Sequence, residues 1–226
     1  YASSLKGIDC RIQIVLGGAQ CNGDVGRASA EKFNFLDWVV NGEGESAILD
    51  VMEILRRGSS EIPPQTSRRL AGKVVHNTSS RAFVDLDKLP YPNFDEYYEN
   101  DTVQKLSFDE WLPIEASRGC WWGKCVFCGL DERGIKCYRR MLDERVVNTM
   151  EHLACRYKKL NFRFVDSVQP IKLVGLTQRL ISSPFDYKFY MSLRPDIPSD
   201  HLEKLSMAGL RQCHFGIESF SQRSLD

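Results

Sequence analysis

The sequence predicts an α/β protein in which part of a doubly wound, parallel sheet precedes part of a β/α barrel. Two observations support this prediction: strand, glycine turn and helix alternate twice before residue 58, and four βα-type units follow residue 113. The composition agrees, because 42% hydrophobic and 27% charged residues are ordinary for a globular protein with a core. A length of 226 residues suffices for one large or two modest domains.

The first predicted domain covers residues 1–58 and repeats one pattern. A short β-branched strand ends near glycines, and a helix with a polar cap follows it. Because YASSLKG at residues 1–7 is typical of the end of a helix, we expect only the C-terminal half of a doubly wound sheet, in a fragment cut at both ends. The expected strands are residues 11–16 and 37–40, and the expected helices are residues 24–33 and 46–57.

A proline-rich linker is expected at residues 59–112. Prolines interrupt this stretch repeatedly, and few of its apolar residues recur at the period of a helix or a strand. Residues 73–84 are expected to add a small hairpin. The linker would therefore join two domains while holding some local structure.

The last segment, residues 113–226, is predicted to form the N-terminal part of a β/α barrel. Strands and amphipathic helices alternate along it, and this alternation is typical of a parallel sheet with crossover helices. In such barrels the functional groups lie at the carboxyl ends of the strands. The expected strands are residues 114–117, 161–165, 187–193 and 213–217, and the expected helices begin at Asp143, Ile171 and Ser199.

Three cysteines after the first of these strands indicate a metal site. Cys120, Cys125 and Cys128 lie in the loop IEASRGCWWGKCVFCGL with the spacing C-x4-C-x2-C. Three thiolates on one loop can hold three irons of a 4Fe–4S cluster, and the fourth iron then stays open to another ligand. The spacing therefore favours a reactive cluster over a purely structural metal.

Two other interpretations of these cysteines remain open. With Cys137 the three thiols could form a four-thiolate zinc site, which would make the chain a zinc-stapled α/β binding module. Structural zinc sites usually have two close pairs separated by a longer loop, whereas these cysteines overlap on one loop. The adjacent Trp121 and Trp122 are also more natural walls for a cofactor pocket. The other alternative is buried thiols without a metal.

The remaining cysteines and the histidines are expected to be structural. Cys155 falls within a predicted helix and Cys213 within a predicted strand, and with Cys137 they are expected to be packing residues. No two histidines share a spacing that is typical of metal ligands. We expect His76, His152, His201 and His214 to serve structural or surface roles.

The cysteine loop resembles that of the radical S-adenosylmethionine superfamily. Its wording, RGCWWG followed by CVFCGL, is similar to cobalamin-type radical enzymes that mature ribosomally synthesised peptides. The usual spacing in the superfamily is C-x3-C-x2-C, and the first gap here holds four residues; members of the similar branch also have a widened gap. The stretch LDKLPYPNFDEYY resembles the connector between the cobalamin domain and the radical core in this family.

The resemblance implies a set of cofactor contacts in the radical core. The cluster would be a 4Fe–4S cluster on Cys120, Cys125 and Cys128, and S-adenosylmethionine would complete it. Reductive cleavage of S-adenosylmethionine would then generate a 5′-deoxyadenosyl radical. The residues that the family places near S-adenosylmethionine correspond to Phe127, Asp166, Ser167, Arg194, Glu218 and Ser219.

Residues 1–58 resemble a Rossmann-like cobalamin-binding domain. The sequences VLGGA and VVNGEGE place glycines after both predicted strands, where a backbone without side chains can approach a ligand. The Asp-x-His-x-x-Gly signature of base-off cobalamin domains is absent from these residues. The expected cobalamin contacts are Gly17, Gly18, Gly42, Glu43 and Gly44.

The implied activity is cobalamin-dependent C-methylation, or a related modification, of a precursor peptide. A cobalamin-independent cyclase or rearrangement enzyme with a different substrate is the alternative within the same chemistry. The expected partner is therefore a precursor peptide or a small-molecule substrate. Either enzyme would need an electron donor such as flavodoxin or ferredoxin. The residues that perform catalysis on the substrate are not identified by the sequence.

Charge and hydropathy exclude several classes of partner. The net charge is zero, with 12 Lys+Arg against 17 Asp+Glu before residue 113 and 18 against 13 after it. The basic residues are dispersed, so no nucleic-acid surface is predicted. No apolar run is long enough to span a bilayer, and no secretory signal is evident. Eight cysteines used in this way are typical of a reducing compartment, so a cytoplasmic protein is expected.

Overall fold

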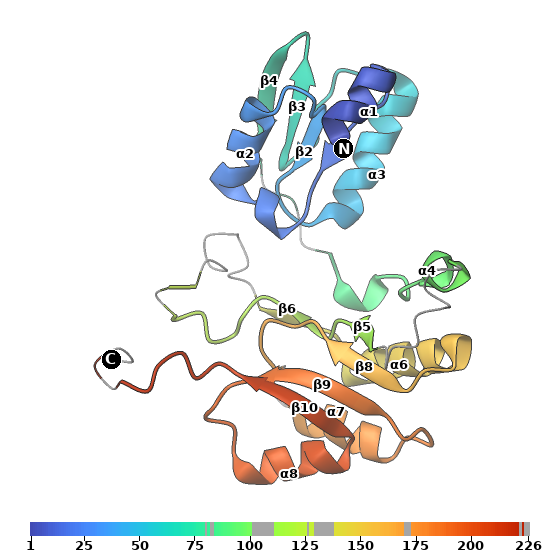
Figure 1. Cartoon of the computed structure of the whole chain (residues 1–226), viewed down its shortest axis with the longest axis vertical. Coiled ribbons are helices and arrows are strands. Elements are labelled where there is room, and N and C mark those ends of the chain that lie inside the picture. The colour runs from blue at the N-terminus through green and yellow to red at the C-terminus, as the bar shows by residue number, and fades with distance from the viewer. Residues whose placement is uncertain are drawn as a thin grey trace. The chain divides into compact units, whose positions relative to one another are not determined.

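The computed structural model describes residues 1–79, 81, 84–100, 111–125, 127–128, 138–169, 173–221 and 223. The chain divides into two compact units, which are Tyr1–Asp85 with Gly123–Lys136, and Leu86–Trp122 with Cys137–Asp226 (Figure 1). Each unit is built on its own α/β sheet. Within the described residues, no helix is both long and apolar enough to cross a membrane.

The first unit has a four-stranded sheet in the order β1-β2-β3-β4. The β1–β2 pair is parallel, as predicted, while β3 and β4 extend the sheet as an antiparallel hairpin. This hairpin precedes the one expected at residues 73–84, and it places part of the predicted linker in the first sheet. The strands are β1 (Val15–Leu16), β2 (Trp38–Val40), β3 (Thr66–Leu70) and β4 (Lys73–Asn77).

Helices cover both faces of this first sheet. Neighbouring residues of β2 contact different helices, because their side chains point to opposite sides of the strand. Val39 packs with Ala30 of α2 (Gly23–Lys32), whereas Trp38 packs with Val51 and Ile54 of α3 (Gly44–Arg57). Figure 1 shows α2 and α3 on opposite sides of the strands. Gly58 ends α3 in the left-handed region with φ of 66°, as the sequence predicts.

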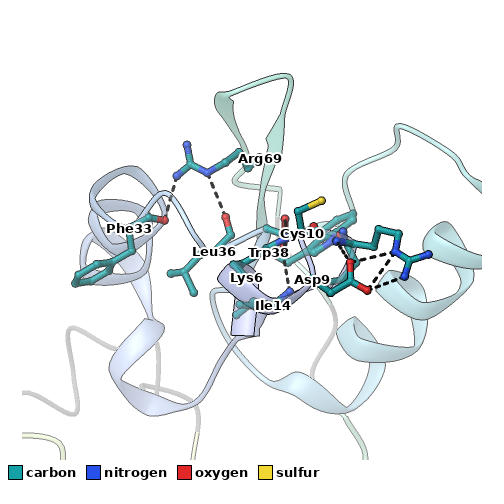
Figure 2. Close-up of polar contacts among 11 residues, drawn as sticks. Lys6, Asp9, Cys10, Ile14, Phe33, Leu36, Trp38 and Arg69 are labelled. Carbon is teal, nitrogen blue, oxygen red and sulfur yellow. Dashed lines mark hydrogen bonds and ion pairs between the residues drawn. The ribbon is translucent and has the colours of Figure 1, made fainter. Parts of the chain in front are cut away.

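Polar contacts fix the first helix, α1 (Ala2–Ile8), to this sheet and fix the β3 strand to the end of α2. Asp37 accepts a hydrogen bond from Lys6 Nζ at 2.9 Å and another from the Ile14 amide at 2.7 Å. Arg69 of β3 donates to the carbonyls of Leu36 and Phe33, each at 3.2 Å (Figure 2). These contacts satisfy backbone groups at the ends of α2 and of the loop that follows it.

The second unit has a sheet of four parallel strands in the order β10-β9-β8-β5. Each new strand joins beside the previous one, so right-handed crossovers place every helix on the same face, as in a β/α barrel. The strands are β5 (Leu112–Ile114), β8 (Asn161–Phe164), β9 (Lys188–Leu193) and β10 (Leu210–Phe215), and the helices are α6 (Asp143–Tyr157), α7 (Leu173–Ile181) and α8 (Ser199–Met207).

The core of the second unit lies on that helix-covered face. Phe189 and Met191 of β9 are buried in one cluster with residues of α6, α7 and α8. Tyr190 and Ser192 alternate with them, point to the other face and are only half-buried. This alternation with period two is the signature of a sheet that is packed on one side.

The connector before the second sheet is bound along α6 rather than free. It contains η2 (Leu86–Lys88) and α4 (Asp95–Glu99). The Leu142 amide donates to Asp87 at 2.8 Å, and the Phe94 amide donates to Tyr157 Oη at 2.7 Å. Two side-chain pairs add to these contacts, a stack of Tyr91 on His152 and an ion pair of Arg156 with Asp95. The second half of the predicted linker therefore belongs to the second compact unit.

Candidate functional site

The carboxyl ends of β8, β9 and β10 meet at one edge of the second sheet, because adjacent strands are parallel. Five of the six residues expected near S-adenosylmethionine follow these strand ends. Phe127 is the exception: it is exposed and lies in the segment Gly123–Lys136 of the other unit. The five residues at this edge are Asp166 and Ser167 after β8, Arg194 after β9, and Glu218 and Ser219 after β10.

Asp166 is a buried carboxylate that is bound to the start of the cysteine loop. Ser117 Oγ donates to one carboxylate oxygen, and the Ala116 amide donates to the other at 3.1 Å. Burial raises the pKa of Asp166 to about 6, although both hydrogen bonds act in the opposite direction. Asp166 therefore holds β6 (Ser117–Arg118), which leads directly to Cys120.

Arg194 is held by three groups of the protein. Its guanidinium binds both carboxylate oxygens of Asp196, at 2.9 and 2.6 Å. Its Cζ atom lies 3.6 Å from the ring centroid of Trp122, and its amide donates to Gln169 Oε1 at 2.8 Å. Contact with a ligand carboxylate, as the resemblance implies for Arg194, would require exchange of its bond to Asp196.

The tryptophans of the cysteine loop are bound to the same edge. Trp121 Nε1 donates to the carbonyl of Gln169 at 2.8 Å, and its ring lies edge-on to Trp122. The sequence indicated the tryptophans as pocket walls but gave no signal for Gln169 or Ser117. These two residues become recognisable only when the sheet brings the ends of β8 and β9 beside the loop.

Glu218 and Ser167 present polar groups at this edge. Both residues are exposed. Glu218 has φ of 62°, a left-handed conformation that is uncommon for a residue with a side chain and that occurs often at functional sites. Ser219 is half-buried, and its amide donates to the carbonyl of Ile217 at 2.7 Å. A tight turn therefore fixes the chain after β10.

In the described part of the chain, the three cysteines of the loop form no disulfide. Cys120 and Cys128 are half-buried and Cys125 is exposed. The Cys128 amide donates to the Cys125 carbonyl at 3.0 Å, so these two residues share one turn. Among the residues that the structure describes, no three His, Cys, Asp or Glu side chains converge to hold a metal ion. Cys137, the fourth thiol of the zinc alternative, lies outside the described residues.

Two of the other cysteines differ from expectation. Cys155 and Cys213 are exposed, so the prediction that they pack in the core is wrong. Cys213 lies in β10, where Arg211, Gln212 and His214 are exposed as well. The sequence pattern located the strand but could not show that the middle of it is exposed.

Glycines mark a second edge, in the first unit. Because β1 and β2 are adjacent and parallel, the loops that follow them lie at the same edge of the sheet. An added Cβ at Gly18 or Gly44 would meet no atom within 4 Å, so the backbone is open to a ligand there. Gly17 and Gly42 complete this glycine edge, and Gly42 has φ of 153°. Glu43 accepts a hydrogen bond from the Val84 amide at 3.1 Å, which gives it a structural role.

Comparison with known proteins supports the fold. No family model and no curated protein matches the sequence. The structure is similar to the radical S-adenosylmethionine methyltransferase TsrM from Kitasatospora setae, solved with cobalamin and a 4Fe–4S cluster bound, with a TM-score of 0.66 and 16% identity over 96% of this chain and 44% of that one.

It is also similar to the apo form of the cobalamin-dependent S-adenosylmethionine radical enzyme OxsB, with a TM-score of 0.66 and 18% identity over 100% of this chain and 38% of that one. The chain thus spans less than half the length of either protein. These similarities confirm the predicted α/β fold with its parallel strands.

Proposed function

We propose that this chain is the cofactor-binding part of a radical S-adenosylmethionine enzyme. The observation that carries the proposal is the position of the three-cysteine loop, which follows the first strand of a parallel sheet covered on one face. The fold similarity to TsrM and OxsB supports it, since both are radical S-adenosylmethionine enzymes. Many folds host unrelated functions, so the chemistry of the loop, rather than the fold, indicates this one.

The thiols suit an iron–sulfur cluster in kind and number. Cys120, Cys125 and Cys128 are soft donors without a disulfide, and a trio leaves one iron open for S-adenosylmethionine. When bound, the cluster would supply the electron for reductive cleavage of S-adenosylmethionine, which protein side chains cannot do.

The strand-end residues would orient S-adenosylmethionine. We expect Ser167 and Glu218 to bind its polar groups, because both are exposed at the edge where β8 and β10 end. Arg194 would bind the carboxylate if Asp196 releases it. Asp166 would act indirectly, by fixing the strand before Cys120 through Ser117.

The glycine edge of the first unit would bind cobalamin. Open backbone at Gly18 and Gly44 suits the close approach of a large ligand, and the position at the carboxyl ends of parallel strands is usual for open sheets. With cobalamin in place, C-methylation of a precursor peptide is the activity that we favour. A cobalamin-independent cyclase remains the second candidate, because the Asp-x-His-x-x-Gly signature is absent from this unit.

Anaerobic reconstitution with ferrous salt and sulfide tests the cluster. We expect a brown protein with roughly four irons per chain, and loss of the colour in Cys125→Ala. Cys155→Ala is the matched control, since it removes an exposed thiol of α6 and none of the three loop thiols. A colourless protein that binds zinc instead, with or without these substitutions, would refute the proposal.

Binding of hydroxocobalamin separates the two candidates. Gly44→Val should weaken cobalt retention because the new side chain fills the open edge at the start of α3, while the melting temperature should change little. Equal retention by the wild type and Gly44→Val would remove the glycine edge as the binding site. Retention by neither would favour the cobalamin-independent candidate. Mass spectrometry of a candidate precursor peptide would then test methyl transfer.

A further inference from the structure

We propose that the two tryptophans in the widened gap between Cys120 and Cys125 bind to the carboxyl edge of the second sheet and so position Cys120 there. We call the four residues that make this contact, Trp121, Trp122, Gln169 and Arg194, the clasp. The inference rests on the proposed function, because Cys120 is taken to be a cluster ligand. Its four members all lie in the second compact unit.

Gln169 joins the loop to two strands. It is buried, with 6% of its surface exposed, and follows the end of β8. Its carbonyl accepts the indole N–H of Trp121 at 2.8 Å, and its side-chain oxygen accepts the amide of Arg194 at 2.8 Å. One residue thus connects the loop, β8 and β9 through two partly buried hydrogen bonds.

Arg194 closes the clasp over the second tryptophan. Its guanidinium carbon lies 3.6 Å from the Trp122 centroid and 5.3 Å from that of Trp121, and its side chain is 17% exposed. The fork to Asp196 fixes the orientation of the guanidinium. The planar guanidinium of arginine can stack on an aromatic ring and bind a carboxylate through two hydrogen bonds at the same time, whereas the ammonium group of lysine cannot.

Cys120 therefore lies between two fixed points of the loop. On one side, Ser117 is bound to Asp166; on the other, Trp121 is bound to Gln169. Both anchors are strand-end residues, so the backbone of Cys120 is held before any metal arrives. A pre-positioned ligand lowers the ordering cost of metal binding.

The clasp also gives a physical reason for the spacing. The first gap holds Trp121, Trp122, Gly123 and Lys124. Both tryptophans are bound to residues that follow strand ends. Only Gly123 and Lys124 are therefore left to connect the clasp to Cys125. Gly123 has φ of 59°, a left-handed turn directly after the clasp. A gap shorter by one residue would lose either an anchor or this turn.

Arg194→Met is the direct test, and Arg68→Met is its matched control. Arg68 stacks on Trp38 at 4.2 Å in the first unit, so the control also removes a guanidinium from a tryptophan face. Arg194→Lys and the pair Trp122→Phe and Trp122→Leu complete the set. Phenylalanine keeps an aromatic face for the cation, whereas leucine does not. This conservative pair guards against a misfolded arginine variant.

Three measurements would be made on each protein. Hydrogen exchange of the metal-free protein over residues 117–122 reports the anchoring of the loop. Iron uptake at limiting iron reports cluster assembly. The electron paramagnetic resonance spectrum of the reduced cluster reports the cluster geometry, which a loss of stability alone would not alter. It is recorded without S-adenosylmethionine, so that the expected contact of Arg194 with that cofactor does not contribute.

We expect Arg194→Met and Trp122→Leu to raise exchange about five-fold or more, as loss of one cation–π contact predicts. Both should also lower iron uptake and alter the spectrum, with Arg194→Lys intermediate and with Trp122→Phe and Arg68→Met unchanged. Unchanged exchange would overturn the clasp, and raised exchange with normal uptake and spectrum would overturn its positioning role. If the wild type itself takes up no iron, the proposed function fails and the positioning role fails with it, whereas the exchange measurement still decides whether the clasp exists.

Discussion

The two sheets of this protein use the same βα repeat but bury different numbers of faces. All three residues of β2 in the first unit are buried, because α2 and α3 pack on opposite sides of the strand. In β9 of the second unit, buried and half-buried residues alternate, because α6, α7 and α8 share one side. Both sheets add their strands in chain order, so the difference arises at β3. This strand pairs antiparallel to β2, and the helix α3 before it is therefore not part of a parallel crossover like those that place α6, α7 and α8 on one face.

The second face of the β8–β9–β10 sheet is polar in consequence. Arg163 lies over Tyr190 at 4.9 Å, and Ser192 pairs in register with His214 of β10. A parallel sheet that is covered on both faces would carry apolar residues at these positions. This polar face ends at the edge that holds the clasp and the strand-end residues.

The largest predicted effect is on the covered face of the second sheet. Phe189 is fully buried, and Phe189→Ala should lower the free energy of unfolding by about 3–5 kcal/mol through lost transfer energy and a residual cavity. Ser192→Ala on the opposite face of the same strand should change it by less than about 0.5 kcal/mol. Urea unfolding followed by circular dichroism measures both. Equal losses would contradict a sheet packed on one side.

A somewhat smaller effect is expected at Asp166. Its pKa of about 6 lies above the ordinary value of 3.8, so the folded state binds the proton more tightly than the unfolded state. Its contribution to stability is fully present below pH 4 and declines as the pH rises through 6, by roughly 2–3 kcal/mol.

Asp166→Asn removes this titration. The difference in unfolding free energy between the wild type and Asp166→Asn should therefore change between pH 4 and pH 7. A difference that stays constant over this range would show that the carboxylate is not buried in solution. Asp166→Ala should in addition leave the Ser117 hydroxyl and the Ala116 amide without an acceptor, and should destabilise at every pH by about 1–3 kcal/mol.

The two-sided packing of the first sheet can be separated by a matched pair. Val39 and Val51 are both fully buried, but Val39 packs with α2 and Val51 lies in α3 against Trp38. Each substitution to alanine should cost about 2 kcal/mol. Hydrogen exchange should rise mainly in α2 for Val39→Ala and mainly in α3 for Val51→Ala. The same pattern in both variants would indicate a single shared core.

The smallest effect concerns the connector on α6. Arg156, followed by Tyr157 and Asn93, lowers the pKa of Asp95 to about 2. The stabilising contribution is therefore present above the ordinary value of 3.8 and is lost as the pH falls toward 2. Asp95→Asn should reproduce at neutral pH the slight loosening of residues 86–99 that acid causes, measured by hydrogen exchange. Asp200→Asn, which breaks an exposed pair with Lys204, is the control and should leave the connector unchanged.

Local patterns in the sequence predicted most helices and strands but missed elements that depend on distant partners. The α3 helix ends at Gly58 and α2 begins near Asp24 because caps and apolar periodicity are local signals. The β3 strand (TSRRL) has no apolar alternation; Thr66 and Ser67 are buried through pairing with β2 and β4. Its polar sequence therefore gave no strand signal.

The site shows the same division. The spacing of the three cysteines and the polar residues after β8, β9 and β10 were visible in the sequence. The roles of Gln169 and Ser117 were not, because their partners are 25 and 49 residues away along the chain. The exposure of Cys213 could not be predicted either, since it depends on which neighbours cover β10.

Mössbauer spectroscopy of the wild-type protein, reconstituted anaerobically with enriched iron, tests the central claim most directly. The account predicts a cubane cluster in which one iron changes its signal when S-adenosylmethionine is added, because three thiolates leave that iron open. A spectrum without a cluster, or a cluster whose irons all ignore S-adenosylmethionine, would contradict it.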